Sequence, residues 1–265
     1  MSLEPKQTLG HSRRSWKTNT LFLIALWLIL LIGSLTILSS VVTPFLKTLQ
    51  TENLISLEWG GYGVSSNVLF PQAVVSSVSG TWNIPTVTVS GLNTFSAAWI
   101  GIGGQTDLTL IQVGTEHDSI AGQAVYNLWY EMLPANSITI PNINVSPGDE
   151  INASITLVNS NTNTWQIAIL DTTTGQGFNQ NFEYNSTRLT AEWIIERPTV
   201  NNQISTLANF GSVTFNNANA KLDGTTGSIS AFPNYEILME NRQNAQLVTV
   251  SGLSRDGSNF TVSYS

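Results

Sequence analysis

The chain has 265 residues and a mass of 28.8 kDa, with 42% hydrophobic residues, 10% charged residues and a formal net charge of −7. This composition excludes a disordered polyelectrolyte, which combines low hydrophobicity with high net charge. The absence of cysteine and the presence of only two histidines exclude disulfides, thiolate metal sites, cysteine nucleophiles and a three-histidine metal site. No Lys or Arg lies between Lys47 and Arg188, so this acidic body repels phosphate backbones and we expect no nucleic-acid partner.

The N-terminal part of the chain carries an apolar segment. Residues 21–42 contain no charged side chain, and a helix of this length spans roughly 33 Å, enough for a hydrocarbon core of about 30 Å. Basic residues dominate residues 1–20, which places them in the cytoplasm by the positive-inside rule. We therefore expect a transmembrane signal anchor at 21–43, a stalk at 44–57 and one exported domain at 58–265. The alternative is a cleaved signal peptide, which would make the domain a secreted protein.

The exported part of the chain shows short alternating or β-branched runs and no convincing helical periodicity. Turn-forming pairs such as Asp223-Gly224 and Asp256-Gly257 separate these runs. This pattern predicts an all-β fold, an antiparallel sandwich of two sheets. The expected strands are 74–84, 95–102, 108–113, 124–132, 138–145, 150–158, 165–171, 177–183, 188–196, 212–220, 235–240, 247–251 and 260–264.

The common catalytic templates do not fit this sequence. A Ser–His–Asp triad would need His117, which lies in Glu116-His117-Asp118 without the glycines of a nucleophile elbow, and we interpret this patch as a solvated turn. The stretches that begin at Asp171 and Asp223 lack the Asp-Thr-Gly loop of aspartic proteases, and we interpret both as β-turns.

A set of local patterns follows in a fixed order along the remaining sequence. These are Trp59-Gly60-Gly61-Tyr62, Gly80-Thr81-Trp82-Asn83-Ile84-Pro85, Ala98-Trp99-Ile100-Gly101-Ile102-Gly103-Gly104, Leu110-Ile111-Gln112-Val113-Gly114-Thr115, Tyr126-Asn127-Leu128-Trp129-Tyr130-Glu131-Met132-Leu133-Pro134, Pro147-Gly148-Asp149 and Ala191-Glu192-Trp193-Ile194-Ile195-Glu196-Arg197-Pro198. This order closely resembles the glutamic peptidases, or eqolisins, which are secreted acid proteases. The likeness extends over residues 59–215.

The resemblance implies a concanavalin- or lectin-like β-sandwich endopeptidase with a Gln/Glu dyad. The catalytic glutamine of the family falls on Gln112 and the catalytic glutamate on Glu196. Glu192 is the earlier glutamate of the same motif and is expected to support the dyad, since residues four apart on a strand point to one face. Glu116 stands where the family tends to carry Asp and is expected to support the dyad as well.

The resemblance also implies residues that line the substrate cleft. They are Trp59, Gly61, Trp99, Gly114 and Glu131. Tryptophan would give apolar walls, and glycine would let a peptide backbone approach closely. The sequence departs from the family at Gly103, where an Asp is usual, which predicts a slower enzyme or a shifted pH profile.

The chemistry of such a dyad can be argued from the side chains. A glutamate takes a proton from water and returns it to the leaving nitrogen, while an amide stabilises the oxyanion and holds the water. An ordinary glutamate pKa of about 4.3 predicts activity at acidic pH. We expect polypeptide substrates, a monomer, and neither a metal nor an organic cofactor. Two alternatives are a lectin-like binding module without catalysis, and a structural envelope protein with an Asn-, Thr- and Ser-rich surface.

Overall fold

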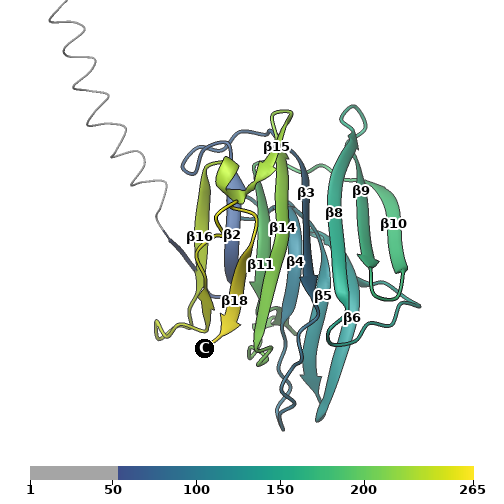
Figure 1. Cartoon of the computed structure of the whole chain (residues 1–265), viewed down its shortest axis with the longest axis vertical. Coiled ribbons are helices and arrows are strands. Elements are labelled where there is room, and N and C mark those ends of the chain that lie inside the picture. The colour runs from purple at the N-terminus through teal and green to yellow at the C-terminus, as the bar shows by residue number, and fades with distance from the viewer. Residues whose placement is uncertain (1–52) are drawn as a thin grey trace, which may run out of the picture. The chain divides into compact units, whose positions relative to one another are not determined.

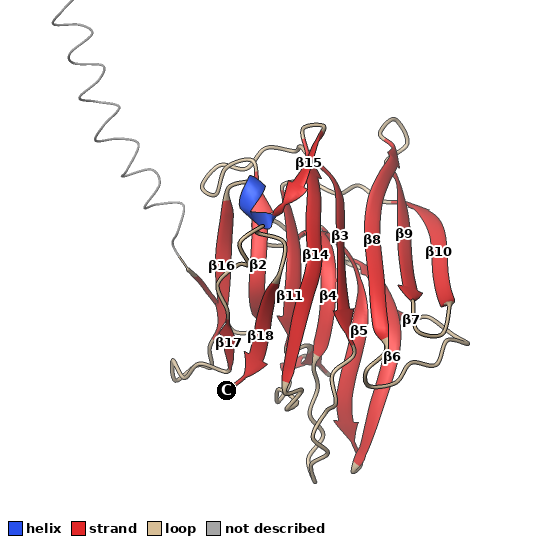
Figure 2. Cartoon of the chain, in the orientation of Figure 1, coloured by secondary structure: helices blue, strands red, loops and turns tan. Residues whose placement is uncertain are grey.

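The computed structural model describes residues 53–265, which form two large β-sheets packed face to face (Figure 1). The described residues are almost entirely strands and loops, with one 3-10 turn, η1 (Ile229–Ala231) (Figure 2). The predicted all-β sandwich is therefore confirmed. The predicted transmembrane segment at 21–43 lies outside the described residues, and no helix within residues 53–265 is long and apolar enough to cross a membrane.

The first sheet has eight strands. Their order is β1 (Leu54–Ser56), β16 (Asn234–Met239), β2 (Trp59–Ser65), β11 (Thr190–Glu196), β4 (Ala97–Gly103), β5 (Leu110–Ile120), β6 (Gln123–Met132) and β7 (Ile138–Thr139). All neighbouring pairs are antiparallel except β1 and β16, which pair in parallel. Because β1 lies within the predicted stalk at 44–57, part of that segment belongs to the sheet.

The second sheet covers one face of the first. Its order is β10 (Gln176–Glu183), β9 (Thr164–Asp171), β8 (Glu150–Asn159), β3 (Val75–Asn83), β14 (Ser212–Leu222), β18 (Phe260–Tyr264) and β17 (Val248–Val250), with β15 (Thr225–Ser228) paired to β14. A separate two-stranded hairpin consists of β12 (Thr199–Val200) and β13 (Gln203–Ile204). These strands agree with most of the expected ranges.

Alternation along each strand decides which side chains enter the core. In β11, Trp193 and Ile195 point between the two sheets, where they join the main core with Trp82, Trp165 and Phe215. The residues between them point to the opposite side of the first sheet, as the period of two in a strand requires. We call this side the free face, since the second sheet does not cover it.

A smaller apolar cluster lies on the free face of the first sheet. Its buried members are Ala97, Trp99, Leu110, Trp129, Ile194, Tyr235 and Ile237. Glycines alternate with these large side chains on the same face. A Cβ on Gly114 would lie 2.6 Å from the Cβ of Trp99, and one on Gly101 would lie 2.8 Å from its Cζ3 atom. The missing side chains therefore leave the room in which the Trp99 indole lies.

The prediction of a solvated turn at Glu116-His117-Asp118 is wrong. The three residues lie inside the 11-residue strand β5. His117 is fully buried on the core side, and its Nε2 atom lies 2.7 Å from the hydroxyl of Thr115. The same hydroxyl accepts a hydrogen bond from Trp82 Nε1 at 3.0 Å. Burial lowers the pKa of His117 to about 3, so this imidazole is neutral over most of the pH range.

The predicted turns at Asp171 and Asp223 are confirmed. Asp171 is buried and its Oδ1 atom accepts hydrogen bonds from the backbone N–H groups of Thr173 and Thr174, at 2.9 and 3.1 Å. Asp223 and Gly224 both have positive φ, 46° and 78°, and connect β14 to β15. Two consecutive residues with positive φ are typical of a tight hairpin turn.

Thr115→Val is expected to lower the free energy of unfolding by about 2–4 kcal/mol, because it leaves polar nitrogens of two buried rings without a partner. Urea unfolding measures the change. The control is Thr214→Val, which removes an exposed hydroxyl pair with Thr261 and should change stability little. Equal effects of the two substitutions would contradict the importance of the buried hydrogen bonds.

Candidate active site

A cavity of about 840 Å³ opens on the free face of the first sheet. Side chains from β2, β5, β6 and β11 line it, together with residues of β1, β16 and the β12–β13 hairpin. The polar and charged lining residues include Glu58, Gln112, Glu116, Asp118, Glu131 and Glu196. The structure thus brings the predicted dyad residues Gln112 and Glu196 to one cavity, together with the predicted residues Trp59, Glu116 and Glu131.

Glu196 is the last residue of β11, and its carboxyl group accepts a hydrogen bond from the indole of Trp99. Trp99 Nε1 donates a hydrogen bond of 2.7 Å to Glu196 Oε2. Burial raises the pKa of Glu196 to about 7, the hydrogen bond from Trp99 opposes this shift, and the carboxylates of Glu58 and Glu131 add to it. Glu196 therefore carries its proton at acidic pH.

Gln112 lies on β5, directly opposite Glu131 on β6. Its Nε2 atom donates a hydrogen bond of 2.5 Å to Glu131 Oε2, which fixes the orientation of the amide because a carboxylate oxygen accepts. The Oε1 atom of Gln112 is buried and makes no hydrogen bond to any residue of 53–265. Burial raises the pKa of Glu131, although the hydrogen bond from Gln112 opposes the shift.

Two tryptophans stand beside Glu196. Trp59 and Trp99 meet edge to face, with ring centroids 5.0 Å apart and an interplanar angle of 80°. Trp59 lines the cavity, but Trp99 is fully buried beneath it. Trp99 therefore positions the carboxyl group of Glu196, and the expectation that it forms an open cleft wall is not met.

Gly61 and Gly114 do not line the cavity either; both lie within the sheet. A Cβ on Gly61 or Gly114 would collide with a backbone oxygen of the neighbouring strand, from Trp193 or Ala98 respectively. Their role in the structure is thus to permit close approach of neighbouring strands and of the Trp99 side chain.

Glu192 is fully buried on the free face and does not reach the cavity. It pairs with Gly63, which also pairs with Tyr235, and a Cβ on Gly63 would lie 2.5 Å from the Tyr235 hydroxyl. Neither carboxyl oxygen of Glu192 hydrogen-bonds to a residue of the described part of the chain. Burial raises the pKa of Glu192 well above its ordinary value of 4.5.

Gly103, where the related family carries Asp, has a φ of +94°. A Cβ at this position would collide with the backbone oxygen of Thr109. The local backbone conformation thus favours glycine, and an Asp at this position would be strained.

Two cavity residues, Glu58 and Asp118, were not among the predicted site residues. The sequence pattern predicts a turn at Asp118, whereas in the structure it lies six residues after Gln112 on β5 and therefore on the same face. Glu58 precedes the first recognised motif by one residue; its Oε1 atom accepts a hydrogen bond of 2.7 Å from Thr199 of the β12–β13 hairpin. Within residues 53–265, no three His, Asp or Glu side chains form a group that could hold a metal ion.

The model of the Peptidase A4 family matches residues 58–264. The chain belongs to the Peptidase A4 family. The resemblance to the glutamic peptidases is therefore confirmed, and the family region begins where the predicted domain begins.

Two curated relatives give alignments of moderate identity. Aspergillopepsin-2 of Aspergillus niger is 31% identical over 174 residues, which are 64% of this chain and 59% of the relative. Scytalidopepsin B of Scytalidium lignicola is 30% identical over 159 residues, which are 58% of this chain and 56% of the relative. The chain thus aligns with less than two thirds of the length of either relative.

Solved structures show the same fold. Scytalido-glutamic peptidase with a transition state analog inhibitor superposes with a TM-score of 0.67 at 24% identity, over 79% of this chain and 99% of that structure. Aspergilloglutamic peptidase from Aspergillus niger gives a TM-score of 0.57 at 29% identity, over 65% of this chain and 99% of that structure.

Glu192→Gln is expected to make the protein relatively more stable as the pH rises. The folded-state pKa of Glu192 lies above the unfolded value of 4.5, so below that pH the group does not alter stability. Above it the unfolded chain loses the proton while the folded chain keeps it, and stability falls by about 1.4 kcal/mol per pH unit.

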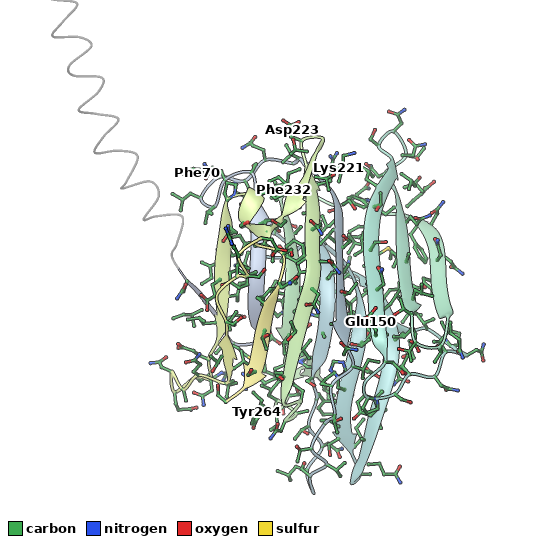
Figure 3. The ribbon with its side chains drawn as sticks, viewed as in Figure 1. Phe70, Glu150, Lys221, Asp223, Phe232 and Tyr264 are labelled. Atoms are coloured by element: carbon green, nitrogen blue, oxygen red, sulfur yellow. The ribbon has the colours of Figure 1, made fainter. Side chains whose placement is uncertain are left out.

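Urea unfolding at several pH values between about 4 and 7 measures this dependence. The difference between the variant and the wild type should grow with pH. The control is Glu150→Gln, at an exposed position on the second sheet (Figure 3). A constant difference across the pH range would show that Glu192 titrates normally.

Proposed function

We propose that this protein is an endopeptidase that hydrolyses peptide bonds at the cavity on the free face, with Glu196 and Gln112 as its catalytic residues. One observation carries the proposal. The carboxyl group of Glu196 and the amide of Gln112 line the same cavity, where Trp99 donates a hydrogen bond to Glu196 and Gln112 donates one to Glu131. Family membership over residues 58–264 supports the same reaction.

Gln112 suits the stabilisation of the tetrahedral intermediate. Its Nε2 atom uses one N–H group on Glu131 and keeps the second for a developing oxyanion. Its Oε1 atom, free of hydrogen bonds within residues 53–265, can accept one from the attacking water. An uncharged amide offers both functions at any pH, which a second carboxyl group would lose on ionisation.

Glu196 acts in its protonated form. A neutral carboxyl group has one donor and free acceptor capacity, so it can give its proton to the scissile amide and take one from the attacking water on the other oxygen. The new C–O bond forms first, the C–N bond of the tetrahedral intermediate then breaks, and Glu196 ends the cycle protonated as it began. The expected order, base first and acid second, followed from an ordinary pKa and is reversed in this proposal.

The raised pKa of Glu196 also changes the reason for an acidic optimum. An enzyme that needs the carboxylate would gain activity as the pH rises through about 7, whereas one that needs the carboxylic acid loses it there. Activity in acid therefore depends on burial, which keeps Glu196 protonated well above the pH at which an exposed glutamate ionises.

The same proposal includes the location of the domain. Residues 21–43 would hold it at the outer face of the membrane, or a cleaved segment would release it. Fractionation of cells that express the full chain tests this point: the intact protein should remain with membranes after a high-salt wash, and a soluble, shortened protein in the medium would establish cleavage.

Glu196→Gln and Gln112→Ala are each expected to reduce kcat/KM on denatured globin at about pH 4 by roughly 100-fold or more, because they remove proton transfer and oxyanion stabilisation. The control is Gln105→Ala, which removes another amide from the cavity wall. Retained activity in either dyad variant would contradict the proposal. No cleavage by the folded wild type would favour the binding-module alternative.

The pH profile of kcat/KM is expected to fall as the pH rises through about 7, and Trp99→Phe should move this limb to higher pH. The substitution removes the hydrogen bond that favours the ionised form of Glu196, so its pKa rises further. Trp129→Phe is the control, since Trp129 lies in the same apolar cluster and lines the cavity but does not hydrogen-bond to Glu196. If the fall of kcat/KM occurs at the same pH in Trp99→Phe as in the wild type, a group other than Glu196 causes it.

A further inference from the structure

Glu116 and Asp118 form a second acidic cluster in the cavity, further along β5 from Gln112. They are two residues apart on one strand, so both point to the free face, and both line the cavity. Asp118 is 5% exposed and its Oδ1 atom accepts a hydrogen bond of 3.1 Å from the backbone N–H of Ser96. Glu116 Oε1 accepts one from the side-chain amide of Asn127. Each carboxyl group is thus held through one oxygen, and its second oxygen has no partner within residues 53–265.

Apolar side chains flank this cluster. Phe95 and Ile120 line the cavity. Phe95 directly precedes Ser96, whose N–H binds Asp118, and Ile120 follows Asp118 by two residues on β5. A site with apolar walls and a carboxyl pair matches the side chain of lysine or arginine, which has an apolar stem and a cationic head.

The rest of the cavity strengthens this match. Its lining includes five carboxyl groups and no Lys or Arg, so no positive charge from the lining compensates the cluster. Gln112 lines the same cavity and is 4% exposed, and its buried Oε1 atom has no hydrogen-bond partner in residues 53–265, as expected of an acceptor that a bound molecule satisfies. A substrate with a cationic side chain would satisfy the free carboxyl oxygens, while the attacking water satisfies Gln112 Oε1.

We infer that Glu116 and Asp118 form a specificity subsite for a lysine or arginine side chain of the polypeptide substrate. The inference rests on the proposed function, because it assigns a substrate class to the same cavity. The ammonium or guanidinium group would lie between the two free carboxyl oxygens, and Phe95 and Ile120 would enclose the stem.

Proton linkage gives this subsite a recognisable signature. Burial raises the pKa of Asp118 to about 7, the charge of Glu116 adds to the shift, and the Ser96 N–H opposes it. A bound cation favours the ionised form, so binding releases a proton and the preference for a cation grows with pH. The other titratable groups of the lining, Glu58, Glu131 and Glu196, are also acids. The neighbouring His117 points to the opposite face of β5, is fully buried, and is neutral above its lowered pKa of about 3.

The test uses pairs of internally quenched peptides that differ by lysine or norleucine at one position near the scissile bond. With wild-type protein, one position should show a kcat/KM about tenfold higher for lysine at about pH 5.5, the size expected of a charge-assisted hydrogen bond. The ratio should increase between about pH 4 and 6. Asp118→Asn and Glu116→Gln should bring it close to one and remove the increase, while Glu150→Gln should keep both.

The two proposals fail in different ways. Equal cleavage of both peptides at every position would overturn the subsite and leave the peptidase intact. Cleavage of neither peptide would overturn the peptidase. In that case binding of the same peptides to the Glu196→Gln protein, measured by calorimetry, decides the subsite: tighter binding of the lysine peptide supports it, and equal binding overturns it.

Discussion

The hydrogen bond from Trp99 to Glu196 is the interaction on which the site depends. It fixes one oxygen of the carboxyl group from within the sheet, and it requires room for an indole on a face where neighbouring strands would normally carry side chains. Gly101 and Gly114 supply that room, and Trp59 packs edge to face against the Trp99 indole. The position of the Glu196 carboxyl group thus depends on glycines that do not line the cavity. The packing of Trp99 on the free face therefore also sets the geometry of the Glu196 carboxyl group in the cavity.

Burial of acids is the second constraint. The carboxyl groups of Asp118, Glu131, Glu192 and Glu196 all have raised pKa values, and in each the largest cause is burial. Asp118, Glu131 and Glu196 line a cavity without Lys or Arg, and the buried Glu192 has no hydrogen-bond partner within residues 53–265, so all four are most easily accommodated when protonated. The same burial that keeps Glu196 protonated in acid therefore also favours the folded protein there. The proposed activity and the stability of the fold would thus share one pH range, because both depend on the burial of these acids.

Much of the fold could be predicted from the sequence, because alternation with a period of two is a local signal. The β14 run, with its buried Val213 and Phe215, is a clear example. Part of the candidate site could be predicted from the order of the sequence motifs, since Gln112, Glu196, Glu131 and Trp59 all line the cavity. Other features needed the structure. Glu116-His117-Asp118 resembles a polar turn, yet its acids face the cavity while its histidine enters the core. The burial of Trp99 and the pKa of Glu196 depend on residues from other strands, which no local pattern contains.

The central claim is that Glu196 works as a carboxylic acid, and its protonation can be measured directly. Protein labelled with ¹³C at the glutamate carboxyl groups gives a titration by NMR, and the signal missing from Glu196→Gln identifies the residue. The account predicts an inflection at about pH 7 that coincides with the fall in kcat/KM. An inflection near 4.5, the ordinary value for glutamate, would contradict it and return Glu196 to the role of a carboxylate base.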